Sequence, residues 1–173
     1  MGDVYELVLT IDVRAGISPA ELAELRWHVG DGPQPDVLPM GTDAVRATFP
    51  LGDPGDPDCE WEDAPPEPLF AGRGGARRTG GALVAELVER EDPVGWALTV
   101  RQELHPDAFH ALRALLAWLG PHSARAHDAG VPRVVGHLRF HESAEHAPLV
   151  LLDGRIRVPD ALEEHTPHWP EQG

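Results

Sequence analysis

Two blocks with alternating strand and helix patterns, residues 4–30 and 82–158, flank a long acidic stretch, and this arrangement limits how the chain can fold. Residues 31–68 contain nine prolines, ten acidic residues and one basic residue, Arg46. Such a composition supplies too little apolar surface for a core element. We therefore expect the two blocks to form the core and the intervening stretch to be an excursion from it.

The first block begins with a strand and continues into a helix. Apolar residues alternate with polar ones from Tyr5 to Val13, which is the period of a half-buried strand. Ser18-Pro19-Ala20-Glu21 then matches a capping box with proline at the first helical position, and Gly30 marks the helix end.

The second block predicts two hairpins around a helix. Residues 82–90 and 95–104 form strands joined by 91–94, and a helix follows from Pro106 to Leu119, with Gly120-Pro121 as the stop signal. Residues 134–143 form the next strand. Residues 149–152 and 155–158 pair across Asp153-Gly154, a sequence typical of a type I′ turn.

The predicted order is βαββαβ with a C-terminal β-hairpin, which resembles the ferredoxin-like α+β sandwich. The resemblance implies an antiparallel sheet with two helices on one face, and it carries no function. We expect one α+β domain over residues 1–158, with 31–72 as a Pro/Asp-rich insertion and 159–173 as a disordered tail. Whether the insertion is ordered stays open, and residues 44–51 are its candidate edge strand.

Charge and cysteine content restrict partners and location. The chain has 29 acidic and 14 basic residues, a net charge of −15 that repels nucleic acids and anionic membranes. We expect neither partner. The single cysteine, Cys59, excludes an intramolecular disulfide and favours a reducing, cytoplasmic location.

The sheet face opposite the predicted core is unusually polar. Its candidate ligand-binding residues are Arg101, Glu103, His137, Arg139 and His141. One interpretation is a pocket in which a histidine acts beside Glu103 while the arginines hold an anion. The other is a solvated or dimer-buried face with cross-strand charge pairs. No metal site is predicted, because His137 and His141 are about 13 Å apart along a strand.

A weaker anion-binding candidate is the glycine-rich segment 72–81, which contains Arg73, Arg77 and Arg78. Its free amides and arginines are suited to a phosphate or carboxylate. However, it precedes a strand, whereas phosphate loops precede a helix. The alternative is a flexible connector whose arginines pair with the acidic insertion.

No nucleotide loop, nucleophile elbow or metal-ligand cassette occurs in the sequence. We therefore expect a non-catalytic ligand-binding or protein-interaction module, forming a homodimer and using no cofactor. Its partner would be a small anionic ligand or a basic protein docked on the acidic insertion. The alternative is a cofactor-independent enzyme of the dimeric α+β barrel type, an oxygenase or isomerase acting on a small organic molecule. Its catalytic candidates would be Glu103, His137, Arg139 and His141.

Overall fold

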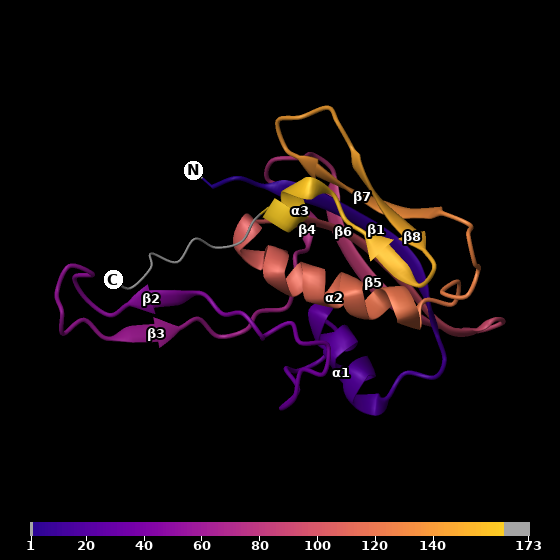
Figure 1. The fold of residues 1–173 in the computed structure, drawn as a ribbon, viewed down its shortest axis with the longest axis horizontal. Helices are drawn as coiled ribbons and strands as arrows, with labels where there is room; N and C mark the ends of the chain where they lie inside the picture. Colours follow the sequence, from indigo (N-terminus) through magenta and orange to yellow (C-terminus); the bar gives the residue numbers. More distant parts are fainter. Residues whose placement is uncertain (1, 165–173) are drawn as a thin grey trace.

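A computed structural model describes residues 2–164 of the chain, and this part is a mixed α+β protein with a large antiparallel sheet (Figure 1). The sheet has seven strands within the described residues, in the order β4-β5-β6-β1-β7-β8-β9. Their bounds are β1 Tyr5–Arg14, β4 Gly74–Gly75, β5 Ala82–Glu91, β6 Val94–Leu104, β7 Arg133–Phe140, β8 Ala147–Leu152 and β9 Arg155–Arg157.

Strand β1 lies between β6 and β7 and is antiparallel to both. The register places Leu9 opposite Val100, and Leu7 opposite Leu138. These side chains are buried, so the period-2 pattern of β1 correctly identified its core face. The β8–β9 hairpin is also confirmed, since Asp153 and Gly154 both have positive φ, as a type I′ turn requires.

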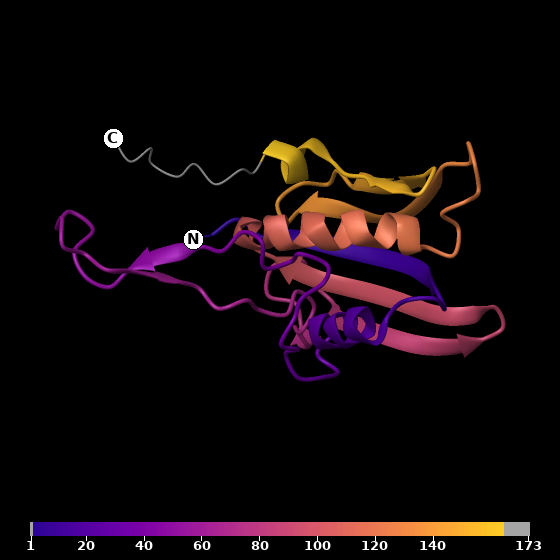
Figure 2. The same cartoon turned by 60° about the horizontal axis from the view of Figure 1, so that its bottom comes forward.

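Helix α1 (Pro19–His28) and helix α2 (Phe109–His122) contribute to the same hydrophobic core as β1 and β6. Figure 2 shows both helices on one side of the sheet. Ser18 caps α1 through the predicted capping box with Glu21. A short 3-10 helix, η1 (Pro106–Ala108), precedes α2. No helix in residues 2–164 is both long and apolar enough to cross a membrane.

The predicted stop of α2 at Gly120-Pro121 was wrong, because the helix continues to His122 with Pro121 inside it. Gly120 has a packing role instead: a Cβ there would lie 2.6 Å from the carbonyl oxygen of Gly154. The absence of a side chain therefore allows α2 to approach the β8–β9 turn closely.

The insertion is partly ordered by pairing with itself. Strands β2 (Thr48–Pro50) and β3 (Trp61–Asp63) form a separate two-stranded sheet rather than an edge of the main one. We call residues 48–63 the arm, because in both cartoon views they project away from the body (Figures 1 and 2). The base of the insertion contradicts the expectation of no core contribution, since Met40, Leu69 and Phe70 are buried in the main core.

The chain also remains structured beyond the predicted domain boundary at residue 158. Residues Asp160–Glu164 form helix α3, and Leu162 is fully buried in the core. A buried leucine fixes this segment to the body, so the expectation of a tail that is disordered from residue 159 was wrong for residues 160–164. The rest of the predicted tail, 165–173, lies outside the described residues.

Candidate functional site

The helix-free sheet face consists of the side chains of β5, β6, β1, β7 and β8 that alternate with the core-facing set. Three exposed valines lie toward its two sides, namely Val84, Val88 and Val134. Polar residues occupy the middle strands. The face therefore combines a charged centre with apolar flanks.

Glu6 of β1 is the centre of this face, and it is only 6% exposed. Arg101 of β6 donates from Nη2 to Glu6 Oε2 at 2.5 Å, and Arg139 of β7 donates from Nε to Oε1 at 3.1 Å. The register explains this arrangement, because Arg139 lies directly opposite Glu6, and Arg101 lies opposite the same-face neighbour Val8. The two guanidinium groups therefore compensate the buried carboxylate from both sides.

The pKa of Glu6 reflects two opposing effects. Burial alone would raise it, because the charged form loses hydration. Hydrogen bonds from Arg139 and Arg101, together with their positive charges, outweigh burial and lower the pKa below its ordinary value. Glu6 is therefore ionised at neutral pH.

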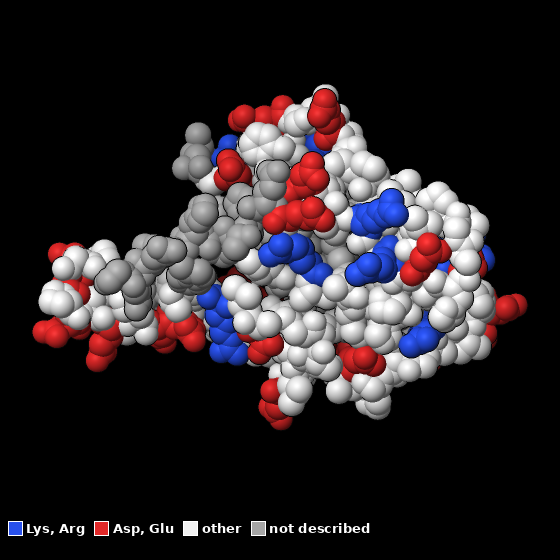
Figure 3. All heavy atoms as spheres, viewed as in Figure 1, with Lys and Arg blue, Asp and Glu red and all other residues white. Residues whose placement is uncertain are grey.

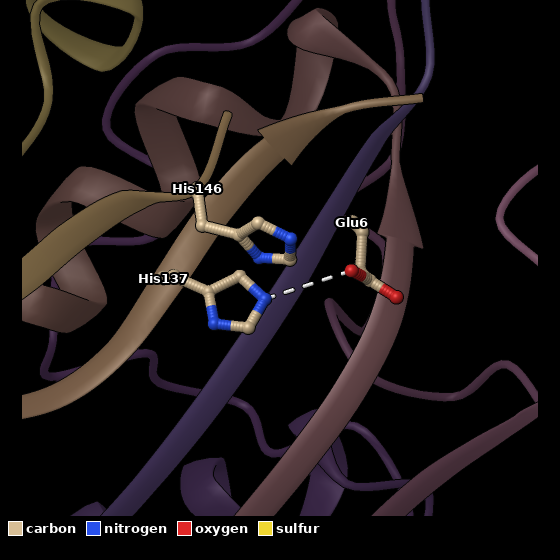
Figure 4. Close-up of side chains that lie close together, drawn as sticks. All are labelled: Glu6, His137 and His146. Carbon is tan, nitrogen blue, oxygen red and sulfur yellow. Dashed lines mark ion pairs between the residues drawn. The ribbon is translucent and has the colours of Figure 1, made fainter. Parts of the chain in front are cut away.

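Two histidines lie against the same carboxylate (Figure 4). His137 Nε2 is 3.5 Å from Glu6 Oε1, and the ring of His146 meets that of His137 edge-on with centroids 4.4 Å apart. One potential ligand atom from each of Glu6, His137 and His146 lies within 4.8 Å of the others. Nε2 of His137 is buried and has no hydrogen-bond partner in the described part of the chain.

Glu103 is directed away from this cluster, into the glycine-rich segment. Its carboxylate accepts hydrogen bonds from the backbone amides of Arg77, Arg78 and Thr79, at 2.7 to 3.0 Å, and from the Thr79 hydroxyl. Partial burial alone would raise its pKa, but the amide hydrogen bonds lower it to about 2. The segment thus holds a carboxylate, and that carboxylate belongs to the protein itself.

The arginines of the glycine-rich segment differ in their contacts. The guanidinium of Arg73 donates to the backbone carbonyls of Phe70, Gly72, Val29 and Ala85. Arg77 and Arg78 line a cleft of about 550 Å³ together with His105. Arg73 and Glu103 line the same cleft. The four carbonyl contacts of Arg73 also fasten the segment to the body.

The structure brings three of the predicted site residues together, namely Arg101, His137 and Arg139, around Glu6. His141 lies just beyond the end of β7, and its Nδ1 is 3.1 Å from the carbonyl oxygen of Val4. The sequence analysis identified neither Glu6 nor His146 as a site residue. The only available signal for His146 was its position immediately before β8.

A second polar cluster is buried beneath the insertion. Glu24 and His28 of α1 are both fully buried and lie 3.4 Å apart through Glu24 Oε1 and His28 Nε2. Glu24 also accepts from the Met40 amide at 2.8 Å and the Thr42 hydroxyl at 2.6 Å. The Leu69 amide donates to His28 Nδ1 at 3.2 Å. Both ends of the insertion are therefore fixed to one turn of α1.

Beside this base lies a cleft of about 530 Å³, lined by Arg46, Glu67, His105, Asp107 and neighbouring residues. It separates the foot of the arm from the start of α2.

The chain matches no protein-family model, and comparisons with curated proteins and with solved structures give no match.

Proposed function

We propose that this chain is a non-catalytic protein-interaction module that uses the arm to bind a basic partner protein. The observation that carries the proposal is the arm itself. It projects from the body and exposes three large apolar side chains, Phe49, Leu51 and Trp61. Trp61 is 54% exposed, although burial of a tryptophan is strongly favourable. Large aromatic residues that remain exposed on a projecting element are typical binding anchors.

The charge of the arm indicates the chemistry of the partner. Residues 48–63 include six acidic residues and no lysine or arginine. Figure 3 shows acidic side chains along the arm, at the left of the view. A surface of this kind attracts a partner with a basic rim around an apolar groove. The net charge of −15 disfavours docking of the arm on a second copy of this chain.

In this proposal the body that carries the arm is a ferredoxin-like sandwich. Supporting observations are the order β5-β6-β1-β7 and the common core shared by α1 and α2. The same body would form a homodimer through the helix-free face, whose flanking valines are exposed. A small anionic ligand at Arg101 and Arg139 is less well supported, because both guanidinium groups are paired with Glu6.

An enzyme of the dimeric α+β barrel type remains the second candidate. His137 next to Glu6 is the observation in its favour, since a second subunit would enclose this pair. Two of the other candidates for that chemistry have partners within the chain: Glu103 is held by backbone amides, and Arg139 by Glu6 and the Ser143 carbonyl. These contacts favour the interaction module.

Carbodiimide cross-linking tests the arm as a binding element. This reagent joins carboxylates to amines, and the sequence contains no lysine, so the side chains of this chain supply only the carboxylate. Purified protein would be cross-linked in an extract of its host, and the cross-linked residues mapped by mass spectrometry. We expect lysines of one partner to be joined to arm carboxylates, and Trp61→Ala to abolish these products.

Two charge-neutralised variants provide the matched comparison. Glu60→Gln, Glu62→Gln and Asp63→Asn remove three carboxylates from the arm, whereas Glu86→Gln, Glu89→Gln and Glu91→Gln remove three exposed ones from β5. Only the arm variant should weaken binding of the identified partner, and by at least tenfold. Equal binding by both variants, or cross-links distributed over the whole surface, would contradict the proposal.

A further inference from the structure

We propose that Glu6, His137 and His146 form a binding site for a divalent transition metal ion of the zinc type. The site lies on the helix-free sheet face and involves no residue of the arm. Imidazole nitrogens and a carboxylate oxygen are ligands that zinc and its neighbours in the first transition series accept. The proposal does not depend on the binding role proposed for the arm, and it concerns the same face that is proposed to form the homodimer.

The geometry of the three side chains is close to that of a metal site. Zinc binds nitrogen and oxygen at about 2.0 to 2.2 Å, so two ligands of a tetrahedral site lie roughly 3.3 to 3.5 Å apart. His137 Nε2 and Glu6 Oε1 have this separation, at 3.5 Å. The donor atoms of all three residues lie within 4.8 Å of one another. His146 is exposed, so a small rotation of its side chain would complete the site.

The state of His137 gives an independent reason for a ligand. Its Nε2 atom is buried and has no hydrogen-bond partner among residues 2–164. A buried polar atom without a partner costs about 1 to 3 kcal/mol of stability. The nitrogen points toward the Glu6 carboxylate in Figure 4. A metal ion between the two would satisfy it.

Glu6 is prepared for this role by its neighbours. Arg101 and Arg139 hold its two carboxylate oxygens in place, at 2.5 Å and 3.1 Å. Arg139 occupies one lone pair of Oε1, and the other lone pair remains for the ion. Carboxylate ligands are commonly held by such outer hydrogen bonds. The two guanidinium charges also repel a cation, so we expect weaker affinity than at structural zinc sites.

Three protein ligands leave a fourth position on a tetrahedral ion. Water or a small anion such as a carboxylate would occupy it. The positive charges of Arg101 and Arg139 favour an anion in this position. The metal would thereby give the face the ligand-binding capacity that the paired arginines lack.

Calorimetric titration with ZnCl2 tests the site. The protein carries ten histidines, so the full-length chain with His165→Ala and His168→Ala would serve as the background for every variant. We expect about one zinc ion per chain in this background. His146→Ala should weaken binding at least tenfold, and since His146 is exposed, this variant should fold normally. His127→Ala, at another exposed histidine, should bind like the background.

A second measurement distinguishes one defined metal site from weak binding at several unrelated histidines. Co²⁺ in a site with nitrogen and oxygen ligands gives visible absorption that depends on its geometry, and His137→Ala and His146→Ala should each remove the same bands. The proposal is overturned if His146→Ala retains full zinc affinity, or if His127→Ala weakens binding as much as His146→Ala does.

Discussion

The hydroxyl of Thr42 donates a hydrogen bond of 2.6 Å to the fully buried carboxylate of Glu24, linking the start of the insertion to helix α1. This contact carries more weight than a surface hydrogen bond, because both partners are buried and one is charged. It joins residues that are 18 positions apart in the sequence. Glu24 therefore holds the first part of the insertion against α1.

Replacing Thr42 by valine should destabilise the protein by about 1.5 to 3 kcal/mol, because a hydrogen bond to a buried charged group is lost. The shape of the side chain is nearly unchanged, so the packing contribution is small. Urea unfolding measures the difference. Thr10→Val, on the exposed face of β1, is the control and should change stability by less than about 0.5 kcal/mol. Equal effects of the two substitutions would argue against the anchoring role of Glu24.

Glu103 should make stability depend on pH in the acid range. Its folded pKa of about 2 lies below the ordinary value of 4.5, so its contribution is complete above pH 4.5 and is lost as pH falls through 2. After allowance for solvent screening we expect on the order of 1 to 2 kcal/mol. Unfolding midpoints of the wild type and Glu103→Gln should converge as pH falls from 5 to 2. A difference that stays constant over this range would exclude the carboxylate as its cause.

Arg101→Lys should destabilise the sheet by about 1 to 3 kcal/mol, because a single ammonium cannot replace a guanidinium that contacts both a carboxylate and carbonyls. Arg101 donates to Glu6 of β1 and to the carbonyls of Gly80 and Ala82 at the start of β5. Arg14→Lys, at an exposed position of β1, is the matched control and should be nearly neutral. Thermal unfolding of both variants checks this expectation, which fails if Arg101→Lys is also neutral.

Gly136 should not tolerate a side chain. A Cβ at this position would lie 1.9 Å from the Val8 carbonyl oxygen, and backbone cannot move aside without separating β7 from β1. We expect Gly136→Ala to lose at least about 3 kcal/mol of stability or to accumulate in insoluble form. A Cβ at Gly16 would meet no atom within 4 Å, so Gly16→Ala should be neutral or slightly stabilising. Soluble yield and urea midpoints compare the pair.

The homodimer proposed for the helix-free face makes a sedimentation prediction. Wild-type protein should sediment as a dimer at micromolar concentration, and Val88→Arg or Val134→Arg should shift it to the monomer, because each places a charge within an apolar contact. Val134 is 71% exposed in the single chain, so its replacement should leave the fold intact. Val37→Arg, at an exposed valine of the insertion, should remain dimeric. A monomeric wild type would refute the dimer.

Local patterns predicted many of the strands, helices and turns, because interactions between residues close in the sequence determine these elements. The alternation in β1, the Ser18 capping box and the Asp153-Gly154 turn each determine a conformation within a few residues. Pro121 shows the limit of such rules. It lies close to the end of α2, where packing of Gly120 against the β8–β9 turn outweighs the local stop signal.

The site was less predictable, because it depends on where side chains far apart in the sequence meet. Alternation correctly placed Arg101, His137 and Arg139 on one face, and the register then brings them to Glu6. No local pattern indicates that Glu103 turns toward the amides of residues 77–79, or that His146 folds back over His137. These contacts follow from tertiary structure, which a single sequence does not reveal.

The buried pair Glu24 and His28 holds both ends of the insertion, since it binds Met40 and Thr42 on one side and Leu69 on the other. These contacts bring the two ends of the insertion together at α1, and we expect residues 43–68 between them to tolerate replacement. We expect the length and sequence of this segment to vary without altering the path of the chain through the sheet, because Glu24 and His28 hold the residues on either side of it. If the arm binds a partner as proposed, replacing it would change the binding specificity and leave the body unchanged.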